Sequence, residues 1–260
     1  MQSLWIAKTG LDAQQTRMSV VSNNLANVNT NGFKRGRAVF EDLLYQNIQQ
    51  AGSSTSQNTI DPTGLTLGTG VRIVATEKQF TQGGRVDTGD STDLMIEGRG
   101  FFQILLPDGN LAFTRDGSFN VDAQGRLVTS NGYEVQPAII VPDGVTALRV
   151  SRDGQVEANI AGQAQPSVLG SIQLADFINP GGLTPRGQNL LLESFASGPP
   201  QVGQPGLNGL GELSQGALET SNVNVVEELV NMIETQRAYE MNSKSIAISD
   251  QMLQYLNNNL

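Results

Sequence analysis

The two ends of this 260-residue chain repeat apolar residues every seven positions, which places them on one face of a helix. At the N-terminal end the repeat holds through four cycles in two interleaved series, with Gln14 as the polar exception. The series are Leu4, Leu11, Met18 and Leu25, and Ala7, Gln14, Val21 and Val28. This pattern predicts a helix with a heptad seam, roughly 40 Å long. Gly10 weakens that helix by about 1 kcal/mol relative to alanine.

The C-terminal end shows the same period. Its series is Val225, Met232, Tyr239, Ile246 and Leu253, widened by Leu229 and other apolar neighbours. Residues 220–224 supply cap-type side chains, and Glu227 and Glu228 follow in the first turns, where the helix dipole favours acids. We therefore predict a helix over roughly 223–257.

Both helices are rich in Asn, Ser and Thr, and a solitary amphipathic helix is marginal in water. Residues 1–44 carry five basic and three acidic side chains, and residues 219–260 carry two basic and six acidic ones, so the ends have opposite charge. Two surface helices on one core, or a coiled coil within the chain, would satisfy the pattern. Seams at both ends of a glycine-rich middle favour termini that pair with each other and with neighbouring molecules.

An asparagine-rich stretch, "SNNLANVNTNGFKR", spans residues 22–35. Leu25 and Val28 continue the seam through it, so we expect the helix to reach Val28. Asn31 and Gly32 then suit a left-handed helix stop.

Other polar side chains of this stretch are candidates for contacts. We expect three amides that lie off the seam to hydrogen-bond to neighbouring helices or subunits, because buried polar groups need partners. They belong to Asn23, Asn24 and Asn27. A basic cluster follows, which could hold an anion or an acidic neighbour, or form a solvated surface. It consists of Lys34, Arg35 and Arg37.

The middle of the chain reads as β structure. Residues 45–70 are polar and lack helical periodicity, so they suit an extended linker arm or a disordered segment. Beyond them, short β-branched and aromatic runs alternate with turn signals such as "PDGN" (107–110) and "SNGY" (130–133), which predicts antiparallel hairpins.

The predicted fold class is α+β. The N- and C-terminal helices pair as a coiled-coil-like helical domain, and a central antiparallel all-β domain and an extended linker arm lie between them in the sequence. The expected boundaries are 1–44 for the first helical segment, 45–70 for the arm, 71–211 for the β domain and 212–260 for the second helical segment.

Composition excludes several functions. The chain has no cysteine and no histidine, which removes disulfides, thiol nucleophiles, Ser-His-Asp triads and almost all zinc sites. The net charge of −9 argues against nucleic acid as a partner. No apolar run approaches the ~20 residues of a membrane span, and the N-terminal residues do not form a secretory leader. Acids beside glycines suit turns better than a catalytic pair. We expect no enzyme activity, no cofactor and no metal.

Several motifs resemble a known family. "SNNLANVNTNGFKR" is similar to the N-terminal signature of bacterial flagellar rod and hook proteins, and "TSNVNVVEELVNMIETQRAYEMNSKSI" (220–246) is similar to their C-terminal signature. "GRGFFQI" (98–104) and "FTRDGSF" (113–119) resemble elements of the family's central β domain. The resemblance covers nearly the whole chain and is weakest over 143–205. The segments around 3–18 and 32–46 look most like subunits of the distal rod.

The resemblance implies a structural subunit that is exported unfolded by the flagellar type III apparatus and polymerises helically into a hollow shaft. The shaft crosses the periplasm to the outer membrane and transmits torque. The implied partners are other copies, the proximal rod and hook proteins, the P-ring and L-ring proteins, the export apparatus and the rod cap. An arm at 45–62 would wedge between subunits and stiffen the rod.

Two sets of residues are expected to make the assembly contacts. The first is the heptad seams on both helices, including Leu229. The second is the signature residues Asn23, Asn24, Asn27, Asn31, Gly32, Phe33, Lys34, Arg35 and Arg237. A proximal rod or hook subunit is the main alternative, and a wall hydrolase or an adhesin module are alternatives from other classes.

Overall fold

The computed structural model describes residues 2–50, 54–56, 59–60, 63–161 and 165–258. It contains two compact units. The first unit combines Met1–Leu25, Gly36–Glu77 and Asn224–Leu260, and the second combines Ala26–Arg35 and Lys78–Val223.

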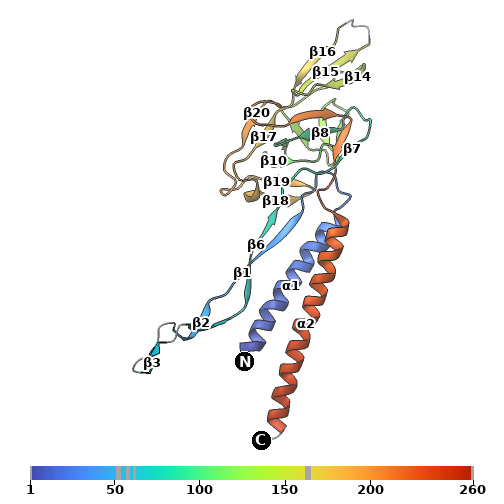
Figure 1. Cartoon of the computed structure of the whole chain (residues 1–260). Helices are drawn as coiled ribbons and strands as arrows, with labels where there is room; N and C mark the ends of the chain where they lie inside the picture. Colours follow the sequence, from blue (N-terminus) through green and yellow to red (C-terminus); the bar gives the residue numbers. More distant parts are fainter. Residues whose placement is uncertain (1, 51–53, 57–58, 61–62, 162–164, 259–260) are drawn as a thin grey trace. The chain divides into compact units, whose positions relative to one another are not determined.

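The first unit holds both predicted helices, α1 (Gln2–Ala26) and α2 (Val225–Asn258), which lie side by side in Figure 1. They run antiparallel, because Asn24 of α1 bonds to Glu228 near the start of α2, whereas Gly10 lies against Asn242 further along. α2 begins as predicted, with Oδ1 of Asn224 accepting hydrogen bonds from the N–H groups of Val226 and Glu227.

α1 ends at Ala26, short of the predicted Val28. The side chain of Asn27 is the physical reason, since its Oδ1 accepts a hydrogen bond from Thr30 Oγ1 while its carbonyl accepts one from the N–H of Thr30. These local bonds favour a turn over a further helical turn.

The rest of the first unit is a two-stranded ribbon, visible beside the helices in Figure 1. Successive strand pairs are nested: β1 (Gly36–Asp42) with β6 (Val71–Lys78), β2 (Tyr45–Gln49) with β5 (Leu65–Gly68), and β3 (Ser54–Ser56) with β4 (Thr59–Ile60). The described residues of the 45–70 stretch are therefore largely paired strands. Their service as an arm between subunits stays a prediction.

The second unit, or β unit, contains the antiparallel β structure that the turn signals predicted. Its largest sheet has the strand order β11-β12-β13-β9-β10-β19-β18, and β17 pairs with both β9 and β20. Those strands are β9 (Phe101–Leu105), β10 (Leu111–Thr114), β11 (Phe119–Val121), β12 (Leu127–Thr129), β13 (Glu134–Gln136), β17 (Leu174–Asp176), β18 (Thr184–Gly187), β19 (Leu190–Leu192) and β20 (Gln201–Gly203). The predicted hairpins at 107–110 and 130–133 join β9 to β10 and β12 to β13.

Smaller ladders complete this unit. They are the sheet of β14 (Val145–Val150), β15 (Gln155–Ile160) and β16 (Ser167–Ser171), the pair β8 (Leu94–Glu97) with β21 (Glu212–Gln215), and the pair β7 (Arg85–Asp87) with β22 (Ala217–Glu219). One 3-10 turn, η1 (Pro180–Gly182), precedes β18.

The core of the second unit lies on both faces of β9. Phe102 packs edge-on against Phe119, with ring centroids 5.0 Å apart, inside the larger apolar cluster. The adjacent Phe101 belongs to a second cluster with Phe113 and Phe177. Successive side chains of a strand point to opposite faces. The two adjacent phenylalanines of "GRGFFQI" therefore pack into the apolar clusters on the two faces of β9.

Among the described residues, no helix combines the length and apolar character that a membrane span requires.

Candidate assembly interface

Asn24 forms a two-point clasp with the backbone of Gly36. Its Nδ2 donates to the Gly36 carbonyl at 2.9 Å, and the Gly36 N–H donates to its Oδ1 at 2.8 Å. The side chain is only 2% exposed, and Nδ2 also lies 3.4 Å from Oε2 of Glu228 on α2. The side-chain amide of Asn24 has the same donor and acceptor groups as a peptide bond, and it fixes the two ends of the loop that runs from α1 to β1. The sequence predicted a neighbouring helix or subunit as partner, and within the chain the shorter bonds go to Gly36.

The other asparagines of this stretch occupy different environments. Asn23 is exposed on α1, and Asn27 is half-buried in the turn after it. The carbonyl of Asn31 accepts a hydrogen bond from Nδ2 of Asn189.

Gly32 adopts the left-handed conformation that the sequence predicted, with φ of 66°, but it lies six residues beyond the end of α1 and therefore is not the helix stop. Its N–H donates to the carbonyl of Glu219 at 2.8 Å. The next residue, Phe33, is buried, and Nζ of Lys78 lies 4.7 Å from its ring centroid.

Lys34 belongs to a buried ion cluster with Glu219 and Arg115. Nζ of Lys34 lies 2.5 Å from Oε1 of Glu219, and Nη1 of Arg115 lies 3.3 Å from Oε2. Lys34 is 3% exposed, Glu219 1% and Arg115 6%. Burial lowers the pKa of the Lys34 ammonium below its usual range, and the Glu219 carboxylate opposes that shift.

Backbone groups complete the cluster. The N–H of Gly83 donates to Oε1 of Glu219 at 2.8 Å, Lys34 donates to the carbonyl of Thr81 at 2.8 Å, and Arg115 donates to that of Gly98 at 2.7 Å. One carboxylate therefore ties the residues after α1, the strand before α2 and two loops of the β unit to each other.

The three residues of the basic cluster predicted from sequence lie in three different environments. Lys34 is in the buried ion cluster, whereas Arg37 pairs with Glu77 on the surface at 3.2 Å. The N–H of Arg35 donates to Oδ1 of Asn222 at 2.7 Å. Sequence reasoning allowed an acidic neighbour but missed its identity, because Glu219 and Arg115 are far from Lys34 in the chain.

The two helices contact each other through small and polar residues. A Cβ atom on Gly10 would lie 2.9 Å from Nδ2 of Asn242, and Nη2 of Arg17 lies 3.5 Å from Oδ1 of Asn231. On α2, Thr235 is fully buried. Gly10 therefore lies at the contact between the helices, with the side-chain amide of Asn242 packed against it.

Only part of the predicted seams is covered within the chain. Ala7 and Val21 of α1 are buried, and the other apolar members of its seams, Leu4, Leu11, Met18, Leu25 and Val28, are half-buried. On α2, Met232 and Ile246 are half-buried, whereas Val225, Leu229, Tyr239 and Arg237 are exposed. The Leu253 side chain lies outside the described part of the structure.

Sequence reasoning missed a polar series on α2. Glu228, Thr235 and Asn242 also recur every seven residues, three positions after the apolar series, and they face α1. This leaves large apolar side chains of the first turns of α2 between 44% and 70% exposed. They are Val226, Leu229, Val230 and Ile233.

A direct prediction follows from the clasp between Asn24 and Gly36. Replacing Asn24 with alanine leaves the N–H and carbonyl of Gly36 without these partners, so we expect the free energy of unfolding to fall by about 1–3 kcal/mol. Urea unfolding followed by circular dichroism measures this. The control is Ser22→Ala, an exposed position of the same helix, which should change stability by less than about 0.5 kcal/mol. Equal effects of the two substitutions would show that the clasp contributes nothing.

Three family models match the chain in the order of its motifs. "Flagella basal body rod protein" matches residues 4–34, "Flagellar hook protein FlgE/F/G D1 domain" matches 95–158, and "Flagellar basal body rod FlgEFG protein C-terminal" matches 214–259. They define the class: flagellar rod and hook proteins.

Individual relatives are more specific. The chain is 59% identical over 254 residues to the flagellar basal-body rod protein FlgG of Buchnera aphidicola subsp. Acyrthosiphon pisum, covering 98% of each chain. It is 48% identical over 260 residues to that of Borreliella burgdorferi, covering 99% of this chain and 98% of the relative. The flagellar hook protein FlgE of Helicobacter mustelae is 45% identical over 138 residues, which is 52% of this chain and 30% of that protein. The chain belongs to the FlgG family of flagellar basal-body rod proteins. It is a structural protein and not an enzyme.

Proposed function

We propose that this chain polymerises helically with copies of itself into the hollow distal rod, the shaft that carries torque to the hook. The observation that carries the proposal is the apolar face at the start of α2, formed by Val226, Leu229, Val230 and Ile233. Burying such side chains is worth about 1.5–3 kcal/mol each when complete. A face of this size on a helix that meets its partner helix through polar residues suits contact with a second copy.

The seam residues and the signature residues Asn23, Asn27 and Arg237 are proposed as further contacts between subunits. In this proposal the neighbours of the polymer are the proximal rod and hook proteins, the P-ring and L-ring proteins and the rod cap. The rod would lie in the periplasm and reach the outer membrane, and its subunits would leave the cytoplasm through the flagellar export apparatus. The ribbon around residues 45–62 would stiffen the shaft by lying between subunits.

The alternative of a hook subunit is less well supported. The hook relative aligns with about half of this chain and with less than a third of its own length, whereas the rod relatives align end to end.

The experiment changes the apolar face without touching the contacts between α1 and α2. We expect the double variant Leu229→Ser with Ile233→Ser to remain folded as a monomer and to need at least about tenfold more protein to polymerise, which corresponds to about 1.4 kcal/mol per contact. Sedimentation and electron microscopy measure the polymer, and circular dichroism measures the fold.

The matched control is the double variant Ile140→Ser with Val168→Ser, which removes two comparably exposed apolar side chains from the β unit. It should polymerise like the unaltered chain. If the α2 variant polymerises equally well, or if the unaltered chain stops at a closed oligomer, the proposed function is wrong.

A further inference from the structure

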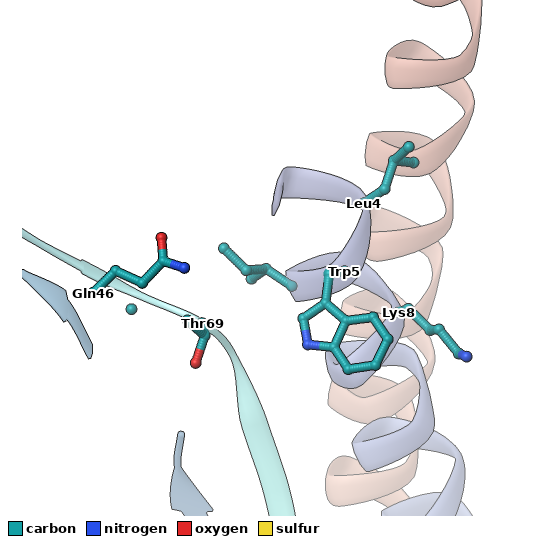
Figure 2. A pocket seen from close by; sticks show the side chains of 7 residues that line it. Leu4, Trp5, Lys8, Gln46 and Thr69 are labelled. Carbon is teal, nitrogen blue, oxygen red and sulfur yellow. The ribbon is translucent and has the colours of Figure 1, made fainter. Parts of the chain in front are cut away.

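An apolar pocket lies between the first turns of α1 and the ribbon, both in the first unit. Its volume is about 620 Å³, and α1 lines it with Leu4, Trp5, Ile6 and Lys8. Figure 2 shows Trp5 on the helix side of the space, with Gln46 and Thr69 on the ribbon across from it. Trp5 is 56% exposed, although it is the single tryptophan of the chain and one of its largest apolar side chains.

The pocket is bounded by a close contact between helix and ribbon. The N–H of Val71 donates to Oγ1 of Thr9 at 3.4 Å, and Gly70 approaches Thr9 so closely that a Cβ atom would overlap its side chain. At its rim Nζ of Lys8 lies 5.5 Å from the centroid of the Trp5 ring. A fixed apolar pocket with a cationic rim suits an apolar segment that carries negative charge.

The last turns of α2 have the matching pattern. Ile248, Met252 and Tyr255 recur at the spacing i, i+4, i+7, and each is more than half exposed. This is the spacing with which an amphipathic helix anchors in an apolar groove. The exposed Asp250 lies on the same turns, and the C-terminal end of a helix carries partial negative charge, which complements Lys8.

Within one chain these side chains remain exposed. α2 continues for sixteen residues past Asn242, its contact with Gly10, whereas α1 has eight residues before that contact. The last turns of α2 therefore extend past the start of α1, where a second copy can reach them.

We propose that the Trp5 pocket receives the last turns of α2, with Ile248, Met252 and Tyr255 as anchors, from a second copy of this chain. This contact rests on the proposed function, since it needs a polymer. It is heterologous, joining the start of one chain to the end of another, and such contacts generate open-ended assemblies.

The absence of cysteine makes a clean cross-linking test available. One chain carries Gln46→Cys at the pocket, and a second, with a different tag, carries Gln251→Cys, which lies between the anchors. We expect a short bismaleimide to join the two tags in the polymer, with a yield at least about tenfold above that of the unassembled mixture, because seating raises the effective concentration. The matched control pairs Gln46→Cys with Ile140→Cys, an exposed position of the β unit, and should give no such yield.

The emission of Trp5 gives an independent readout. It should shift to shorter wavelength on polymerisation of the unaltered chain, and the shift should disappear in polymers of Met252→Ser with Tyr255→Ser. Polymers that form without the cross-link or without the shift would overturn this contact and leave the proposed function standing. Failure of the unaltered chain to polymerise would overturn the proposed function as well.

Discussion

Glu219→Gln is expected to lower the free energy of unfolding of the β unit by about 3–5 kcal/mol, the usual effect of breaking a buried ion pair from one side. The substitution preserves shape but removes the one anion that Lys34 and Arg115 share at 2.5 Å and 3.3 Å. Lys34 would then remain buried without its carboxylate partner, and Arg115 would retain only the electrostatic attraction of Asp176. Urea unfolding followed by tyrosine emission and circular dichroism measures the loss.

Two further variants test whether the loss of stability comes from the buried ion cluster and not from removing any charge in this unit. Asp108→Asn breaks an exposed pair with Arg186 in the same unit and should cost less than about 1 kcal/mol. Replacing all three charges at once, Lys34→Met, Arg115→Met and Glu219→Leu, should recover much of the stability, because no buried charge is left unpaired. If Glu219→Gln is no more harmful than Asp108→Asn, the ion cluster does not stabilise the β unit.

The features that sequence predicted correctly are those set by residues close together in the chain. The cap at Asn224, the left-handed Gly32 and the hairpin turns at 107–110 and 130–133 each depend on a few neighbouring residues. The family signatures added the order of the elements, which local propensities alone do not determine.

The features that sequence did not predict depend on distant partners. Nothing near Lys34 marks it as buried, since its partner Glu219 follows 185 positions later and Arg115 comes from a third segment. Likewise, the apolar period of α2 predicted which residues share a face, but not which face meets α1. The face that meets α1 carries Glu228, which bonds to Asn24, and Asn242, which packs against Gly10.

The helix pairing therefore changes the interpretation of the heptad pattern. A buried apolar seam would have predicted a self-sufficient helical hairpin. Polar side chains instead occupy the contacts between α1 and α2, at Glu228 and Asn242, while Leu229 and Ile233 stay exposed. Such a pair gains less from burial within the chain than a fully apolar seam would, so part of its stabilisation is left for assembly.

Gly32→Ala is expected to cost about 2–5 kcal/mol, from left-handed strain and from overpacking together. The backbone φ of 66° disfavours any side chain, and a Cβ atom would lie 2.6 Å from the carbonyl carbon of Arg115 and from the nitrogen of Asp116. Both are backbone atoms, so no rotamer change relieves the overlap. The segment must move, and with it Lys34, which cannot leave Glu219 without exposing the ion cluster.

The matched control for this variant is Gly132→Ala. Its φ of 82° imposes comparable strain, but nothing lies within 4 Å of the added Cβ atom. The difference in unfolding free energy between the two variants isolates the contact of Gly32 with the Arg115–Asp116 backbone. We expect Gly32→Ala to be the more harmful by at least about 1 kcal/mol. Equal losses would mean that the segment after α1 is not fixed against the rest of the β unit, and that the left-handed conformation of Gly32 serves only to turn the chain.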